Sequence, residues 1–272
     1  MKRKTTAHLV ALCVAGMLIV SLMNILVVSA SPEDNRWALI FGIETFDMSG
    51  GFGPAPYCPP EAIAFNDTLV TCYDWDPSHI MLLIDEEATR EAIIDGIAWL
   101  EEHDGPNSKI VFWASSHGAY AGHKSERISY ICCYGFSLWD MEEAIYDYEL
   151  QEWFSDFEAP EIIFVLSTCY SGGMHPELDS SGMFNLCGDD FDSWWDYEEL
   201  QPYGNLYIVG YFLIKGLQDP AADTNDDGTV SMEEAFVYLE AGIDTRVGNN
   251  KNGKVPTPTL YDGVSGETLL TL

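Results

Sequence analysis

Basic side chains are scarce in this sequence. The 272 residues include 12 lysines and arginines against 44 aspartates and glutamates, which gives a formal net charge of −32 at pH 7. A chain with this charge repels phosphate backbones and anionic membrane surfaces. We therefore expect no nucleic-acid partner. The acidity itself fits a high-salt medium, a cation-rich surface or simple solubility.

Zinc motifs are also missing. The sequence has no Cys-x-x-Cys pair with a matching partner and no His/carboxylate cluster such as His-Glu-x-x-His. The first absence argues against a structural zinc site, and the second argues against a metal-dependent hydrolase. No internal repeat or low-complexity tract occurs. The 47% of hydrophobic residues suffice instead for one globular domain with a substantial core.

The amino-terminal segment, residues 1–30, has the organisation of an export signal. Lys2-Arg3-Lys4 precedes a long apolar stretch that ends in Val28-Ser29-Ala30. A basic region, a hydrophobic region and a small-residue cleavage site predict export and a mature chain that begins at Ser31. The stretch is long enough to span a bilayer, so an uncleaved membrane anchor is the alternative. Either way we expect the domain, residues 31–272, to be secreted or to lie on the extracellular face of the membrane.

Apolar runs and helical repeats alternate along this domain. The expected strands are Trp37–Ile43, Ile80–Ile84, Lys109–Ala114, Arg127–Tyr134 and Ile162–Leu166, and the expected helices are Glu61–Tyr73, Glu86–His103 and Met141–Phe154. Strand and helix in this rhythm predict an α/β fold with a mainly parallel sheet covered by helices.

Two of the expected strands end in reactive side chains. Ser115-Ser116-His117-Gly118 closes one apolar run, and a segment from Ser167 through Cys169 to Gly173 closes another. Open α/β sheets gather their chemistry at the carboxyl ends of strands. A thiol there needs a base, and imidazole is the usual one. The pattern predicts a cysteine–histidine dyad, with the backbone N–H groups of Gly118 and Cys169 as donors to an oxyanion.

A buried cysteine is also a common core residue, and most histidines are structural or lie on the surface. His117 and Cys169 differ from the other histidines and cysteines because each ends a strand and has glycine close behind it. Glycine lets backbone N–H groups approach a substrate closely.

These residues resemble the caspase-like cysteine peptidases, the group of caspases, metacaspases, legumains and gingipains. His117-Gly118 and Cys169-Tyr170-Ser171-Gly172 occur in the family's order, with the two dyad residues 52 positions apart, and Ala38–Ile43 resembles the family's first strand. The resemblance runs from Trp37 to the carboxyl terminus. It implies a three-layer sandwich with helices on both faces of the sheet. It also implies that His117 accepts a proton and that Cys169 is the nucleophile of an endopeptidase acting on a peptide or protein.

The sequence departs from this family at one position. Many metacaspases and legumains carry Asp or Glu two residues before the nucleophile, where it shapes the primary specificity pocket, whereas this chain has Ser167. A preference for basic residues does not carry over from that position. Asp189, Asp190 and Asp192 follow a segment that borders the same pocket in the family. They either restore the negative charge or form a solvated acidic loop.

The cysteines cannot all pair if Cys169 is a free thiol. Cys13 falls in the export segment, and the five remaining cysteines are an odd number. Since Cys58 and Cys72 flank one expected helix outside the cytoplasm, a bridge between them is one expectation, and two free thiols are the other.

Residues 223–234 fit an EF-hand calcium loop. Asp223, Asn225 and Asp227 offer oxygens at positions 1, 3 and 5, Thr229 offers a carbonyl at position 7, and Glu234 offers a carboxylate at position 12. Gly228 stands at the sharp turn, and apolar helical spacing flanks the loop on both sides. The pattern predicts Ca²⁺ binding that stabilises the domain. The alternative is an Asp-rich helix cap without metal. After the loop, Thr268–Leu270 reads as an edge strand.

Two functions remain open from the sequence. The first is an exported cysteine endopeptidase of caspase-like fold. The second is a catalytically inactive calcium-binding module with a binding or structural role, which the serine at position 167 keeps open.

Overall fold

The computed structural model describes residues 34–47, 52–123, 127–189, 205–247 and 255–271. Asn35–Leu272 forms one unit, distinct from Met1–Asp34. The expected export segment lies outside the described residues. Among the residues that are described, every helix is too short or too polar to cross a bilayer.

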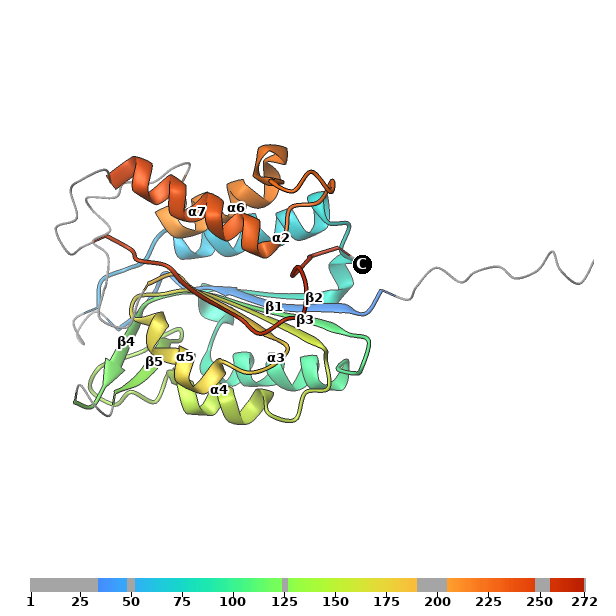
Figure 1. Cartoon of the computed structure of the whole chain (residues 1–272). Helices are drawn as coiled ribbons and strands as arrows, with labels where there is room; N and C mark the ends of the chain where they lie inside the picture. Colours follow the sequence, from blue (N-terminus) through green and yellow to red (C-terminus); the bar gives the residue numbers. More distant parts are fainter. Residues whose placement is uncertain (1–33, 48–51, 124–126, 190–204, 248–254, 272) are drawn as a thin grey trace, which may run out of the picture. The chain divides into compact units, whose positions relative to one another are not determined.

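A central sheet of six strands is the core of the fold, in the order β2-β1-β3-β7-β8-β9 (Figure 1). The strands are β1 (Arg36–Gly42), β2 (Ile80–Ile84), β3 (Lys109–Ser115), β7 (Glu161–Ser167), β8 (Met183–Cys187) and β9 (Thr259–Asp262). All neighbours are parallel except β8 and β9, which are antiparallel. The expected mainly parallel sheet is confirmed.

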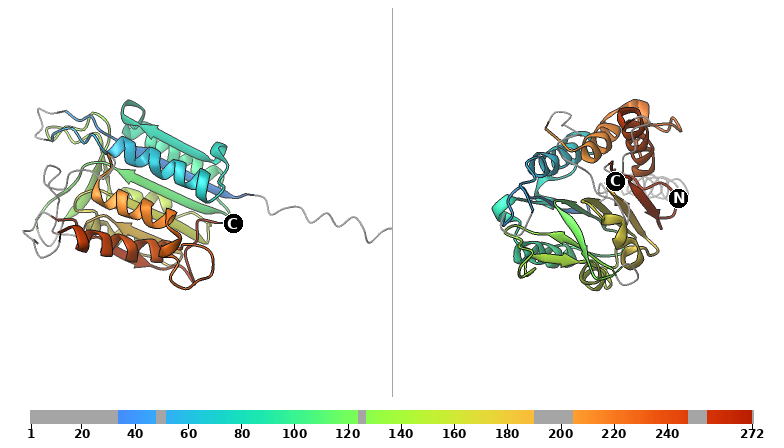
Figure 2. Two further views of the ribbon diagram at one scale, coloured as in Figure 1. Left: turned by 90° about the horizontal axis from the view of Figure 1, so that it is seen from above. Right: turned by 90° about the vertical axis from the view of Figure 1, so that its left-hand side faces the viewer.

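Helices cover both faces of this sheet (Figures 1 and 2). They are α2 (Cys58–Cys72), α3 (Arg90–Glu102), α4 (Asp147–Phe154), α5 (His175–Leu178), α6 (Ile208–Gln218) and α7 (Met232–Val247). In Figure 1, α2, α6 and α7 lie on one face, and α3, α4 and α5 lie on the other. The three-layer α/β architecture follows.

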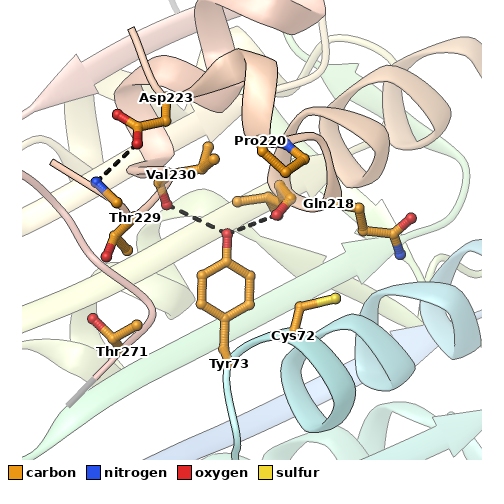
Figure 3. A pocket seen from close by; sticks show the side chains of 10 residues that line it. Cys72, Tyr73, Gln218, Pro220, Asp223, Thr229, Val230 and Thr271 are labelled. Atoms are coloured by element: carbon orange, nitrogen blue, oxygen red, sulfur yellow. Dashed lines mark hydrogen bonds between the residues drawn. The ribbon is translucent and has the colours of Figure 1, made fainter. Parts of the chain in front are cut away.

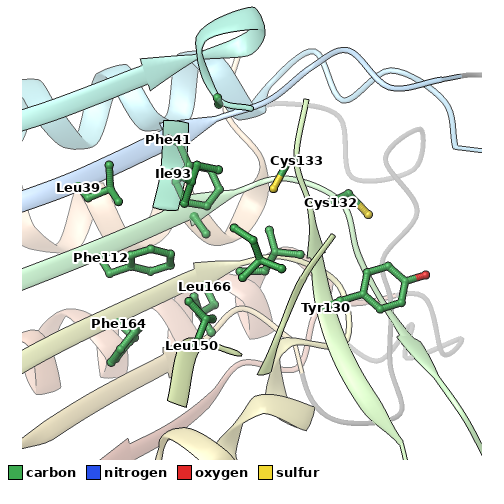
Figure 4. Packing of buried hydrophobic residues seen from close by; sticks show 14 of the residues in the cluster. Leu39, Phe41, Ile93, Phe112, Tyr130, Cys132, Cys133, Leu150, Phe164 and Leu166 are labelled. Carbon is green, nitrogen blue, oxygen red and sulfur yellow. The ribbon is translucent and has the colours of Figure 1, made fainter. Parts of the chain in front are cut away.

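Apolar residues on both faces hold the central strands in place. Phe112 and Phe164 point into the core under α3 and α4 (Figure 4), whereas Trp113 and Val165 point into the core under α2, α6 and α7. Successive side chains of a strand face opposite sides, so strands buried on both faces need continuous apolar runs. This requirement explains why β1, β3 and β7 were predictable from the sequence.

Two expected elements differ in the structure. The expected helix Met141–Phe154 divides into a short strand, β6 (Ala144–Tyr146), and α4, because β6 pairs with β5 (Ile128–Cys132). With β4 (Gly118–Ala121), these strands form a second sheet of three strands. The expected Arg127–Tyr134 strand is confirmed as β5, with shorter bounds.

The prediction of an edge strand at Thr268–Leu270 is wrong. The edge strand is β9, and 268–270 is not a strand. There the backbone is held by side chains instead: the Glu233 carboxylate accepts from the Thr268 N–H at 3.0 Å, and the Leu270 carbonyl accepts from Trp75 Nε1 at 2.8 Å.

The expected Cys58–Cys72 bridge is also wrong. Both cysteines are free, and they stand at the two ends of α2. A helix rises about 1.5 Å per residue, so its ends are about 20 Å apart, far beyond the Cα separation that a disulfide allows. The helix between the two cysteines therefore holds their thiols too far apart to form a disulfide.

The contact between β1 and α2 yields a prediction about stability. A methyl group added at Gly42 would lie 2.4 Å from the Cys58 carbonyl oxygen. We expect Gly42→Ala to lower the free energy of unfolding by about 1–3 kcal/mol through overpacking. Gly105→Ala is the matched control, since nothing lies within 4 Å of its added methyl. Chemical denaturation measures both variants, and equal stabilities would contradict the close approach of β1 to α2.

Candidate active site

The two reactive residues emerge at the same edge of the sheet. β3 and β7 pair in parallel, with Ser115 opposite Ser167. His117 and Cys169 each follow two residues later. In-register parallel strands deliver the residues that follow them to one edge at the same level.

Their backbones are in direct contact. A methyl group added at Gly118 would lie 2.4 Å from the Cys169 carbonyl oxygen and 2.8 Å from Thr168 Oγ1. No side chain fits there, so Gly118 is required by this close approach. The structure thus brings the His-Gly segment against the segment that carries Cys169, an arrangement that the expected dyad requires.

His117 lies in an aromatic surrounding. Its ring centroid is 4.7 Å from that of Phe46 and 5.0 Å from that of Phe52, and its side chain is buried. Burial lowers the pKa of His117 below its usual value, and the hydrogen bond to Gly53 opposes this shift. The effect of burial on the pKa is the larger of the two, because the aromatic rings replace the water that would solvate an imidazolium. A neutral imidazole is the form that can act as a base.

The same hydrogen bond selects the tautomer. Nε2 lies 2.9 Å from the carbonyl oxygen of Gly53. A carbonyl only accepts, so Nε2 carries the hydrogen, and Nδ1 is the basic atom of the neutral ring.

Cys169 stands at a sharp turn. The next residue, Tyr170, has φ of 58°, in the left-handed region that non-glycine residues rarely adopt. Ser171 Oγ donates to the Thr168 carbonyl at 2.8 Å, and the Gly172 N–H donates to the Asp189 carbonyl at 2.8 Å. These bonds hold the turn in its strained form, a feature that clusters at active sites.

The residues expected to bind substrate differ in where they lie and in whether the structure describes them. Ser167 is buried at the end of β7. Asp189 is fully buried, so it is not part of a solvated loop, and its Oδ1 accepts from the Thr257 N–H at 3.1 Å. Asp190 and Asp192 lie outside the described residues.

One residue near the dyad was missed by the sequence reasoning. Glu61 of α2 is fully buried, and Ser115 Oγ donates to its Oε1 at 3.0 Å. A signal existed, because Glu61 shares a helix face with Phe65 and Leu69, which are also buried. A carboxylate on the apolar stripe of a helix points to a buried polar contact.

The expected calcium loop lies between α6 and α7. Gly228 has φ of 97°, as the sharp turn requires, and the Asp223 carboxylate accepts from the Gly228 N–H at 2.8 Å. Asn225 Oδ1 accepts from the Asp227 N–H at 2.8 Å, and Glu234 Oε1 accepts from the Thr224 N–H at 2.7 Å. Within the described part of the chain, no three His, Cys, Asp or Glu side chains converge to hold a metal ion.

A cavity of about 350 Å³ borders the loop, lined by Asp223 and Thr229 together with Tyr73. Figure 3 shows the Tyr73 hydroxyl between the carbonyls of Leu217 and Val230, at 3.0 and 3.3 Å. These bonds connect the end of α2 to both sides of the loop.

Known proteins resemble this chain in fold but not in sequence. No family model matches the chain, and no curated protein matches its sequence. Caspase-1 from Spodoptera frugiperda matches in structure with a TM-score of 0.61 at 11% identity, over 88% of this chain and 90% of that chain. Protein GSU0716 from Geobacter sulfurreducens matches with a TM-score of 0.58 at 13% identity, over 85% and 94%. The chain therefore has a caspase-like α/β fold.

Proposed function

We propose that this chain is a cysteine endopeptidase that hydrolyses peptide bonds with His117 and Cys169. The observation that supports it most is the backbone contact of Gly118 with Cys169, at paired strand ends of a caspase-like fold. That contact puts the expected base, nucleophile and oxyanion donors on two adjoining segments.

In this reaction Nδ1 of His117 takes the thiol proton of Cys169, and the thiolate attacks the substrate carbonyl carbon. The N–H groups of Gly118 and Cys169 donate to the oxyanion that forms. The C–N bond then breaks, and the imidazolium returns its proton to the departing amine. Water, activated by His117, hydrolyses the thioester and frees the thiol.

Replacement of either dyad residue tests the proposal. Cys169→Ser and His117→Asn should each lower kcat/KM for peptide hydrolysis by at least about 10²-fold, because loss of a general base alone costs about 10²–10⁴. Cys72→Ser and His123→Asn alter exposed residues of the same types and should keep full activity. Thermal unfolding confirms that each variant is folded.

Wild-type turnover in either dyad variant would contradict the assignment. Complete inactivity of the wild type on a broad peptide library would favour the alternative, a calcium-binding module without catalysis.

We propose also that residues 223–234 bind Ca²⁺ through Asp223, Asn225, Asp227, Glu234 and the carbonyl of Thr229. All of these ligands are oxygens, which calcium prefers. Partial burial raises the pKa of Glu234, but hydrogen bonds from the backbone of Ser231 and Thr224 outweigh it and lower the pKa overall. The carboxylate is then ionised and ready for a cation. Bound calcium would replace some of these backbone contacts as ligands converge.

Calcium should raise the melting temperature of the wild type. At free Ca²⁺ one hundred times the dissociation constant, the added stability is about 2.7 kcal/mol. Glu234→Gln should lose most of this gain, whereas Glu240→Gln, on the exposed side of α7, should retain it. Melting temperatures measured with chelator and with calcium test this prediction. Equal values in the wild type would contradict calcium binding and support the alternative, an acidic helix cap without metal.

Export is the third part of the proposal, and it rests on the sequence of residues 1–30. We expect native protein outside the cytoplasm, beginning at Ser31 if the signal is cleaved. Amino-terminal sequencing of secreted and membrane-bound fractions distinguishes cleavage from anchoring. A cytoplasmic protein that retains Met1 would contradict both.

A further inference from the structure

A cavity of about 320 Å³ lies at the end of the sheet opposite the dyad. Its lining residues include Ile162 and Met183, at the starts of β7 and β8, together with Phe154 of α4 and Glu177 of α5. β7 has seven residues, so the cavity is about 20 Å from the strand ends that carry the dyad. The cavity is therefore separate from the candidate active site.

Aromatic and aliphatic side chains form one part of the cavity wall. Phe154 and Leu178 are buried, whereas Phe157 and Met183 are half-buried. The ring centroids of Phe154 and Phe157 are 4.7 Å apart, and the rings are tilted by 33°. The face of an aromatic ring attracts a cation, and its apolar body packs against an alkyl chain. This wall suits a ligand that combines both features.

One carboxyl group lines the same cavity without a basic partner. Among the described residues, no Lys, Arg or His forms an ion pair with Glu177, and none of these residue types lines the cavity. Burial raises the pKa of Glu177, and the neighbouring Asp147 carboxylate raises it further. Asp147 itself differs, because it accepts hydrogen bonds from the N–H groups of Ser129 and Tyr148. A cation beside Glu177 would compensate its charge.

The carboxyl-terminal end of α4 adds a partial negative charge. Gln151 and Phe154 in its last turns line the cavity, as does Ser155 at its C-cap. The last turn contains no basic residue. The exposed carbonyl groups at this end of a helix favour a cation nearby. The carboxyl group, the aromatic rings and the helix end therefore all favour a ligand of positive charge.

We propose that this cavity binds an organic cation, a guanidinium or ammonium group on a short alkyl stem, with the charge beside Glu177 and the stem against Phe154 and Phe157. The inference does not depend on the peptidase proposal, because the cavity shares no residue with the dyad. Its volume is at the small end of the range for ligand sites, which suits a small molecule or a single side chain. Both a free alkylguanidine and an arginine side chain of a partner protein have this chemistry.

n-Butylguanidinium and n-butylurea test this inference in the wild type. The two molecules have nearly the same shape, but only the first is charged. A ligand-observed NMR titration should give an affinity for the cation at least about fivefold above that for the urea, because a partly exposed ion pair and a cation–π contact each contribute modestly. Equal affinities, or binding of neither molecule, would overturn the inference without any variant.

Glu177→Gln then assigns the preference to one carboxyl group. The variant should lower the ratio of the two affinities toward one. Glu101→Gln removes the same charge from the exposed surface of α3 and should leave the ratio unchanged, which controls for general attraction of cations by this acidic chain. Thermal unfolding confirms that both variants are folded. A ratio that stays at the wild-type value in Glu177→Gln would overturn the proposed site.

Peptides distinguish the two sources of the cation. A blocked tripeptide with a central arginine and its citrulline counterpart are titrated into Cys169→Ser, which the peptidase proposal predicts not to cleave them. A preference for the arginine peptide that Glu177→Gln abolishes assigns the cavity to a side chain of a partner protein. A preference shown only by n-butylguanidinium assigns it to a small molecule. Cys169→Ser should bind n-butylguanidinium as the wild type does, so failure of the peptidase proposal leaves this inference standing.

Discussion

The in-register pairing of β3 with β7 is the constraint on which the site depends. Ser115 lies opposite Ser167, so His117 and Cys169 leave the sheet at the same level. A slip of one residue would turn every side chain of one strand to the opposite face. The two apolar cores prevent such a slip, because Phe112 and Trp113 would exchange surroundings. Packing far from the site thus determines how the two segments of the proposed dyad lie against each other.

The surroundings of each site residue then set its chemistry. Phe46 and Phe52 exclude water from His117 and keep it neutral, and the Gly53 carbonyl selects its tautomer. Glu61 experiences the same desolvation, with the opposite effect on its pKa because its charged form is an anion. One cause, burial at the ends of the strands, therefore yields a neutral imidazole and a carboxyl group that titrates near neutrality.

The sequence predicted the features that depend on local pattern. Continuous apolar runs identified β1, β3 and β7, and the ends of β3 and β7 lead into the two segments of the proposed dyad. The sequence-based prediction failed where contacts with distant parts of the chain determine the local structure. Ala144–Tyr146 is a strand because β5 lies beside it, and 268–270 is not one because Glu233 and Trp75 hold its backbone. Glu61 was missed because its partners are supplied by β3 and α6.

Covalent labelling tests the central claim most directly. The wild-type protein is treated with a peptidyl electrophile that reacts with thiolates, and the modified residue is identified by mass spectrometry. The account predicts modification of Cys169 alone, lost when His117 is replaced by Asn, because the proposed mechanism assigns a base, His117, to that thiol. Labelling of the exposed Cys72 in preference to Cys169, or labelling of Cys169 that does not depend on His117, would contradict the account.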